Sequence, residues 1–145
     1  PNLSRFKKFL LDDKKIVKVT KDYIDKLRIK TSSPKAPANT LSGGNQQKVV
    51  IAKWLYLDAD VYIFDEPTRG IDVGARDEIY EIMYDLIANG AAIIMISSDL
   101  VEVLKMCDSV MVMREGEVEG ILENDSELTQ EKVLSYALYG GNNND

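Results

Sequence analysis

A serine followed by two glycines stands at the predicted start of a helix. The stretch reads Leu41-Ser42-Gly43-Gly44-Asn45-Gln46-Gln47-Lys48, and the run from Asn45 to Leu57, which has no Gly or Pro, predicts the helix. The first amides of a helix have no partner within it and lie at the positive end of its dipole, while glycine lets a phosphate approach the backbone closely. These residues predict an anion site, with the alternative that Ser42 caps the helix and the glycines form a turn.

Two adjacent carboxylates end a short apolar run. The β-branched and aromatic residues from Val61 to Phe64 predict a buried strand, and Asp65-Glu66 follows it directly. Open α/β sheets bind their ligands at the carboxyl ends of parallel strands, so Asp65 is placed to hold Mg²⁺ directly or through water. Glu66 beside it is placed to polarise an attacking water. The alternative is that the two acids are only solvated at the strand end.

A third loop, Gly70-Ile71-Asp72-Val73-Gly74, leads into the next predicted helix. On these residues alone, Asp72 has the type and position of an N-terminal helix cap. Apolar residues recur at helical spacing between Gly74 and Gly90, which predicts an amphipathic helix that stops at Gly90.

The elements around the motifs predict a parallel sheet. A second buried strand is expected from Ala92 to Ile96. Because a strand, a helix and a strand in that order form a right-handed crossover, this strand and the one at Val61 to Phe64 are expected to be parallel.

Smaller elements are predicted after this sheet. A short helix is expected from Ser98 to Met106, with Ser98 as its cap. A hairpin is expected from Ser109 to Arg114 and from Glu117 to Leu122, around Glu115-Gly116. A last helix is expected from Thr129 to Tyr139, capped by Thr129.

The first 40 residues predict two amphipathic helices and a loop. Thr20 is expected to cap the second helix, and the stretch from Thr31 to Asn39, rich in proline and small polar residues, is expected to be a loop. The apolar positions are Phe6, Phe9 and Leu10 in the first helix and Tyr23, Ile24, Leu27 and Ile29 in the second.

Composition excludes several classes of protein. The chain has 145 residues, and its formal net charge of -6 argues against a nucleic-acid partner. There is no histidine, which removes imidazole metal sites and histidine-centred triads. The single cysteine, Cys107, gives no disulfide framework, so a reducing cytoplasm is expected. The chain begins with Pro1 rather than methionine, which suggests a longer protein.

Together, in this order and spacing, the three motifs resemble the second half of an ATP-binding cassette (ABC) nucleotide-binding domain. The resemblance implies an α/β fold, namely a partial P-loop NTPase (ABC ATPase) fold in which a parallel sheet is flanked by helices but lacks the P-loop strand. It divides the chain into a remnant of the helical subdomain with its loop (1–40), the carboxyl-terminal part of the ATPase core (41–139) and a disordered tail (140–145).

The resemblance also implies roles for individual residues. The signature residues Ser42, Gly43, Gly44 and Gln46 would contact the γ-phosphate of an ATP held mainly by a partner domain. Asp65 would hold Mg²⁺ through water, and Glu66 would be the catalytic residue for ATP on this domain's own P-loop. Asp72 would be the D-loop residue that crosses the interface. Ser98 occupies the switch position, where most family members have a histidine, so the two ATP sites are expected to hydrolyse at unequal rates.

Within the family, the motifs look most like the carboxyl-terminal half of ATPase subunits from bacterial importers of ribose, galactose, xylose and similar sugars. That resemblance implies three partners: the other nucleotide-binding half, a transmembrane permease subunit and, indirectly, a periplasmic or extracellular sugar-binding protein. The implied location is cytoplasmic, peripheral to the membrane through the permease.

No glycine in the chain is followed by lysine, so a P-loop is absent from it. The chain alone is therefore expected to be inactive, and its unpaired strand edges are expected to favour self-association. Two alternatives remain, namely a stand-alone interaction module that does not hydrolyse ATP, and a head fragment of a DNA-repair ABC ATPase.

Overall fold

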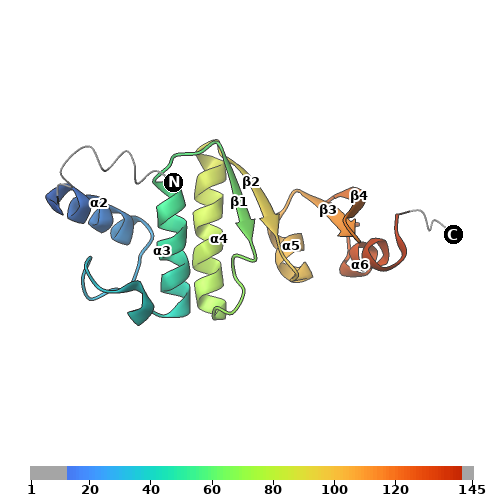
Figure 1. Cartoon of the computed structure of the whole chain (residues 1–145). Helices are drawn as coiled ribbons and strands as arrows, with labels where there is room; N and C mark the ends of the chain where they lie inside the picture. Colours follow the sequence, from blue (N-terminus) through green and yellow to red (C-terminus); the bar gives the residue numbers. More distant parts are fainter. Residues whose placement is uncertain (1–12, 142–145) are drawn as a thin grey trace. The chain divides into compact units, whose positions relative to one another are not determined.

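The computed structural model describes residues 13–141, which fall into two compact units (Figure 1). The first unit holds residues 13–61 and 68–92, and the second holds residues 62–67 and 93–141. The predicted helix around Phe6, Phe9 and Leu10 lies outside the described residues. The division into 1–40, 41–139 and 140–145 stays a prediction.

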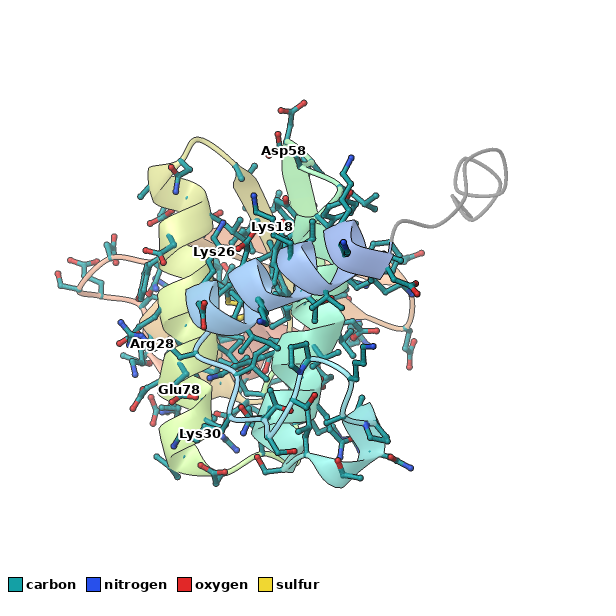
Figure 2. The ribbon with its side chains drawn as sticks, turned by 90° about the vertical axis from the view of Figure 1, so that its left-hand side faces the viewer. Lys18, Lys26, Arg28, Lys30, Asp58 and Glu78 are labelled. Carbon is teal, nitrogen blue, oxygen red and sulfur yellow. The ribbon has the colours of Figure 1, made fainter. Side chains whose placement is uncertain are left out.

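Helix α2, Asp13–Lys26, opens the first unit. Thr20 lies in the middle of this helix rather than at its start, so its predicted capping role is wrong. The helix begins earlier because the run from Asp13 to Val19 contains no Gly or Pro to interrupt it. The lysines of α2 that Figure 2 labels, Lys18 and Lys26, are exposed.

The end of α2 is set by backbone geometry. Arg28 has a φ of 50°, and the amide of Ile29 donates to the carbonyl of Ile24 at 2.9 Å, which is the hydrogen bond of a Schellman motif. The helix therefore ends before Leu27 and Ile29, whose side chains are buried. The loop that follows contains one 3-10 turn, η1, Ala38–Thr40.

Two longer helices lie side by side in the first unit, α3, Gly43–Leu55, and α4, Val73–Ala88 (Figure 1). Both predicted helices are confirmed. Helix α4 ends at the C-cap Asn89, and Gly90 follows with a φ of 92°, a conformation that glycine adopts readily.

Strands β1, Val61–Asp65, and β2, Ala92–Ile96, form a two-stranded sheet. The amide of Ala92 donates to the carbonyl of Asp60 at 2.9 Å, and the amide of Glu66 donates to the carbonyl of Ile96 at 2.8 Å. Because the partners advance in the same direction along both strands, the sheet is parallel, as predicted.

The prediction that both strands are buried is wrong. Ile63 is 67% exposed, and Ile94 and Ile96 are 53% and 51% exposed. Exposed and less exposed residues alternate along the strands, so one face of the sheet is uncovered by the described residues. An apolar run shows only that a strand can be buried. The strand becomes buried when another element packs on that face of the sheet.

The second unit continues with α5, Leu100–Met106, and the hairpin of β3, Ser109–Arg114, and β4, Glu117–Glu123. The hairpin is antiparallel, and both turn residues, Glu115 and Gly116, have positive φ values as the tight hairpin turn requires. The predicted hairpin is confirmed. Within residues 13–141, β2 and β3 belong to separate sheets.

Helix α6, Gln130–Tyr139, packs on the hairpin, and the hydroxyl of Thr129 accepts from the amide of Lys132 at 3.3 Å, which confirms the predicted cap. The core of the second unit is made of aliphatic side chains from α5, the hairpin, the loop before α6 and α6 itself: Val103, Val110, Val112, Leu128 and Val133.

The amide of Gly141 donates to the carboxylate of Glu119 at 3.3 Å. The remainder of the predicted disordered tail, residues 142–145, lies outside the described residues. In the part of the chain that the structure describes, no helix has both the length and the apolar character needed to cross a membrane.

Candidate functional site

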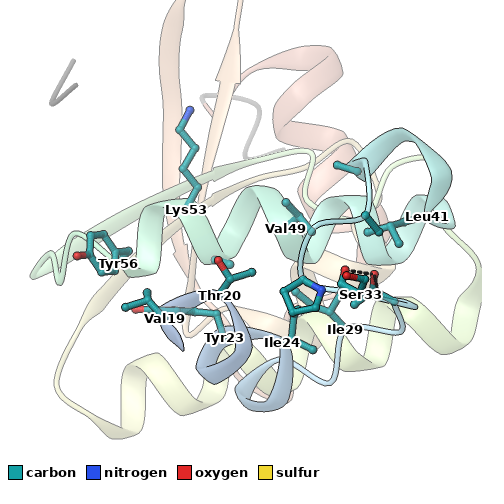
Figure 3. Close-up of a pocket in the computed structure, with 15 residues that line it drawn as sticks. Val19, Thr20, Tyr23, Ile24, Ile29, Ser33, Leu41, Val49, Lys53 and Tyr56 are labelled. Carbon is teal, nitrogen blue, oxygen red and sulfur yellow. Dashed lines mark hydrogen bonds between the residues drawn. The ribbon is translucent and has the colours of Figure 1, made fainter. Parts of the chain in front are cut away.

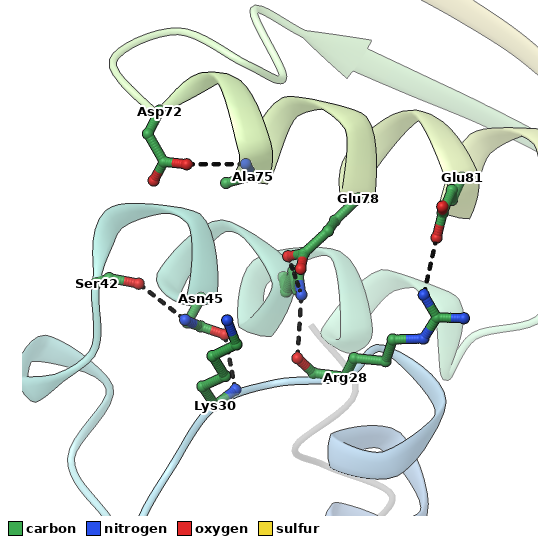
Figure 4. A network of polar contacts seen from close by, with 9 residues as sticks. Arg28, Lys30, Ser42, Asn45, Asp72, Ala75, Glu78 and Glu81 are labelled. Atoms are coloured by element: carbon green, nitrogen blue, oxygen red, sulfur yellow. Dashed lines mark hydrogen bonds and ion pairs between the residues drawn. The ribbon is translucent and has the colours of Figure 1, made fainter.

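The start of α3 leaves its first amides available. Ser42 occupies the N-cap position, but its hydroxyl makes no cap hydrogen bond to the helix backbone. Its Oγ instead accepts from Nδ2 of Asn45 at 2.8 Å, and Oδ1 of Asn45 accepts from the amide of Lys30 at 2.8 Å (Figure 4). A second side chain, Gln46, donates to the carbonyl of Leu41 at 2.8 Å. These bonds fix the turn while the N-terminal helix amides keep no intrahelical partner, which is the arrangement that an anion requires.

The two glycines have different surroundings. A Cβ on Gly44 would lie 2.5 Å from the Cβ of Ala75, so the close approach of α3 and α4 requires glycine there. A Cβ on Gly43 would meet Cγ2 of Ile71 only at 3.8 Å, an ordinary contact. Packing therefore explains Gly44 but leaves Gly43, which is exposed, open to a ligand.

The loop before α4 lies against the start of α3 through these contacts. Asp72 caps α4, and its carboxylate accepts from the amide of Ala75 at 2.9 Å (Figure 4). The structure thus brings the predicted signature residues and the predicted D-loop residue together in the first unit.

A buried lysine, Lys48, links the helices that carry these residues. Lys48 is 1% exposed, and its Nζ donates to the carbonyl of Arg28 at 3.1 Å and forms an ion pair with Glu78 at 2.5 Å. Helix α3, helix α4 and the end of α2 are therefore joined at one ammonium group. Sequence reasoning missed this role, although Lys48 shares the buried face of α3 with Gly44, Ile51 and Leu55 at helical spacing.

A second group of predicted residues lies in the second unit, at the carboxyl ends of β1 and β2. Asp65 is exposed, and Glu66 is half-buried with a φ of 48°, a left-handed conformation that is uncommon for a residue other than glycine. One carboxylate oxygen of Glu66, Oε1, accepts from the backbone amide of Ser98 at 3.0 Å. The predicted catalytic residue and the predicted switch position are thus in direct contact.

Ser98 does not cap α5, so that prediction is wrong. The N-cap is Asp99, whose Oδ1 accepts from the amides of Val101 and Glu102 at 3.1 and 3.3 Å. A cap at Ser98 would place the first helical residue at Asp99, but the helix starts one residue later, at Leu100. The carboxylate of Asp99 is the better acceptor for a helix terminus because its charge also complements the helix dipole.

The chemistry of Asp65 fits a bound Mg²⁺ that keeps most of its own ligands. Among residues 13–141, no three acidic or cysteine side chains gather as a complete cation cage. Mg²⁺ usually retains several waters and takes one or two carboxylates together with phosphate oxygens, so one exposed carboxylate at a strand end is a suitable protein ligand.

A pocket of about 340 Å³ opens between α2, the loop after it and α3 (Figure 3). Its walls include Val19, Tyr23, Val49 and Tyr56 and are mainly apolar. None of the predicted phosphate-contacting or carboxylate residues lines it. The pocket is therefore separate from the two groups described above.

Comparison with known proteins gives the class first. The ABC transporter family matches this chain over residues 3–69. Among solved structures, a nucleotide-free ATP-binding cassette from an ABC transporter aligns with a TM-score of 0.74 and 25% identity over 90% of this chain and 50% of that one. The fold is thus a partial P-loop NTPase fold of the ABC ATPase class, as the motifs predicted.

Two curated relatives narrow the resemblance. The chain is 60% identical over 120 residues to the ribose import ATP-binding protein of Geobacillus kaustophilus, covering 83% of this chain and 24% of that protein. It is 52% identical over 118 residues to the arabinose import ATP-binding protein of Chromohalobacter salexigens, covering 81% and 24%. The predicted resemblance to the ATPase subunits of sugar-importing ABC transporters is confirmed, and the chain spans about a quarter of the length of these relatives.

The rival DNA-repair class carries long coiled coils. Within residues 13–141 the longest helix, α4, has 16 residues, which is shorter than three heptads. The described part of the chain therefore shows no sign of such an arm.

Proposed function

We propose that this chain supplies one half of each of two ATP sites in the ATPase subunit of an ABC importer for a monosaccharide. The observation that carries the proposal is the separation of the candidate residues into two groups with different chemistry. The group at the start of α3 offers backbone amides and a hydroxyl, which suit a phosphate. The group at the ends of β1 and β2 offers carboxylates, which suit a metal ion and a water molecule.

The signature group acts on an ATP held mainly by the partner nucleotide-binding half. Ser42 and Gly43 meet the γ-phosphate with a hydroxyl and a helix-terminal amide. Gly44 keeps α3 close to Ala75, and Gln46 fixes the turn through its bond to Leu41. Asp72, which caps the adjacent helix α4, couples the two sites.

The carboxylate group acts on an ATP held by a P-loop of its own half. Asp65 would hold Mg²⁺ through water, and the bound ion would neutralise charge on the phosphate oxygens. Glu66 accepts a proton from the attacking water or orients it, because one of its oxygens is engaged by the Ser98 amide and the other remains to receive a water.

The partners follow from this role. A transmembrane permease subunit couples closure of the two halves to transport, and a periplasmic or extracellular sugar-binding protein delivers the sugar to that permease. The complete polypeptide is cytoplasmic and attached to the membrane through the permease.

The test is sugar uptake by the complete polypeptide. In cells that lack other monosaccharide importers, uptake of radiolabelled ribose and arabinose is measured with the unsubstituted polypeptide and with Glu66→Gln. We expect uptake of at least one sugar, and we expect Glu66→Gln to remove most of it. Uptake that is absent for every monosaccharide tested, or unaffected by the substitution, would overturn the proposal.

A further inference from the structure

We propose that Ser97 and Glu102 are positioning residues for the Glu66 carboxylate, acting on it through the backbone amide of Ser98. The inference rests on the proposed function of Glu66. It adds two side chains that act on the reacting group through the backbone of the turn from Ser97 to Asp99.

The first step is that Glu66 needs an external support. Its backbone is in the left-handed region, with a φ of 48°, which is unfavourable for a residue with a side chain. Such a conformation persists only when neighbouring contacts determine it. Two contacts are present, one from the amide of Glu66 to the carbonyl of Ile96 and one from the amide of Ser98 to the carboxylate of Glu66.

The second step is that the Ser98 amide itself is held in place. Ser97 donates its hydroxyl hydrogen to Oε2 of Glu102 at 2.6 Å, and its Oγ accepts from the amide of Asp99 at 3.0 Å. One serine hydroxyl therefore joins the backbone of the turn, at the amide of Asp99, to the side chain of Glu102 in α5.

The third step is the burial of the anchor. Glu102 is 3% exposed, so the acceptor of the Ser97 hydroxyl is fixed inside the second unit rather than moving in solvent. A short hydrogen bond to a buried carboxylate is among the stronger polar contacts. The turn from Ser97 to Asp99 is therefore bonded to a buried side chain. Because the turn cannot move freely, the Ser98 amide holds the Glu66 carboxylate in one place.

The chain of contacts explains how the half-buried Glu66 carboxylate keeps one orientation. The hydrogen bond from the Ser98 amide is exposed, and an exposed bond by itself would exchange with water. With the turn fixed, one oxygen of Glu66 stays on the Ser98 amide, which leaves the other to receive an attacking water. Loss of the Ser97 hydroxyl should loosen this orientation without touching the nucleotide.

The first arm of the test uses the chain itself. The amide resonance of Ser98 is assigned by NMR in the unsubstituted chain and in Ser97→Ala, Ser97→Thr and Glu66→Ala. Glu66→Ala reports the amide without its acceptor. Because residue 97 precedes Ser98 and shifts its resonance directly, the readout is the protection of the Ser98 amide against hydrogen exchange, corrected for the neighbouring residue. We expect Ser97→Ala to lower this protection most of the way toward the Glu66→Ala value, and Ser97→Thr, which keeps the hydroxyl, to restore it. Protection that is unchanged in Ser97→Ala would overturn the proposal.

The second arm measures ATP hydrolysis in the complete polypeptide. We expect Ser97→Ala to lower kcat on the order of tenfold, the loss expected for one or two hydrogen bonds, while KM for ATP stays the same. A role in folding alone would reduce the amount of folded protein while kcat per folded molecule stays unchanged. Ser135→Ala is the matched control, because the Ser135 hydroxyl bonds only the carbonyl of Lys132 on the exposed face of α6.

A further variant guards against misfolding. If Ser97→Ala does not fold, Ser97→Cys replaces it, since a thiol has nearly the same size but is a weak donor and acceptor. An unsubstituted polypeptide without ATPase activity would refute the proposed function, whereas the NMR arm would still decide the positioning role. A rise in KM with kcat unchanged would contradict the positioning role while leaving the proposed function intact.

Discussion

The start of α3 and the edge formed by β1 and β2 are built in different ways. The start of α3 is organised by local hydrogen bonds and by Lys48, a lysine buried to 1% exposure that joins three segments. The site at the carboxyl ends of β1 and β2 depends on Glu66, whose backbone is in the left-handed region. Its carboxylate accepts a hydrogen bond from an amide 32 residues away. The first group offers fixed backbone donors for a phosphate, and the second offers one oriented carboxylate. If the proposed roles hold, we expect substitutions that disturb packing to act mainly on the start of α3, and substitutions that free the Glu66 carboxylate to act mainly on hydrolysis.

The largest effect is expected from blocking the signature group. Ser42→Arg places a long charged side chain over the first amides of α3, so it should remove most ATP turnover by the complete polypeptide. Ser98→Ala keeps the backbone amide that contacts Glu66 and should have a far smaller effect. Steady-state hydrolysis of both variants measures this, and a Ser98→Ala loss equal to the Ser42→Arg loss would refute the model of two unequal sites.

The next effect concerns the carboxylate group. Glu66→Gln keeps the size of the side chain and an acceptor for the Ser98 amide but removes the base. Single-turnover hydrolysis at this half's own site should slow on the order of 10²-fold, while ATP affinity stays the same. An unchanged single-turnover rate would remove Glu66 from catalysis.

Stability separates the two glycines of the signature. Gly44→Ala forces α3 and α4 apart at Ala75 and should lower the free energy of unfolding by roughly 1–3 kcal/mol. Gly43→Ala meets only ordinary contacts and should change the free energy of unfolding by less than about 0.5 kcal/mol. Urea denaturation of the two chains provides the comparison. Equal losses would show that packing does not distinguish the two positions.

The smallest expected effect concerns the reactivity of Cys107, whose pKa is affected by burial and by the charge of Glu102. Burial raises the pKa of the Cys107 thiol, and the charges of Asp108 and Glu102 raise it further. Because the thiolate is the nucleophile, alkylation should accelerate only at a pH above that of an ordinary cysteine. The raised pKa means that the protonated thiol contributes to the free energy of unfolding. This contribution is fully present below the pKa of the unfolded thiol and is lost as the pH rises through the pKa of the folded thiol.

Removal of one charge sharpens this measurement. Glu102→Gln should move the pH profile of alkylation slightly downward, while unfolding in urea should return it to that of an ordinary cysteine. The rate of reaction with iodoacetamide as a function of pH gives both values. A profile that matches free cysteine in the folded chain would contradict the assignment.

Much of this arrangement was predictable from local sequence. The bounds of β2, the hairpin turn at Glu115-Gly116 and the cap at Thr129 follow from residue types over a few positions. The anion-binding character of the start of α3 also follows, because it depends on glycines and helix geometry. Local signals failed at Thr20 and Ser98, where neighbouring residues set the helix boundary instead.

Other features depend on contacts between residues far apart in the sequence, which the spacing of apolar residues does not predict. The exposure of Ile63 and Ile94 is decided by whether any element covers the sheet, which a continuous apolar run does not specify. The contact of Glu66 with the Ser98 amide joins two strand ends, and its geometry follows from the parallel pairing and from the turn after β2. The burial of Lys48 could have been suspected from its place on the apolar face of α3.

The central claim is that this chain carries half of each of two ATP sites and a complete version of neither. Titration calorimetry of the chain with Mg-ATP tests it most directly, because the start of α3 alone offers only a helix terminus and the strand edge alone offers only carboxylates. The account predicts no measurable binding at tens of micromolar ATP. A dissociation constant in the low micromolar range, about -8 kcal/mol, would show that the chain holds the phosphates by itself and would contradict the account.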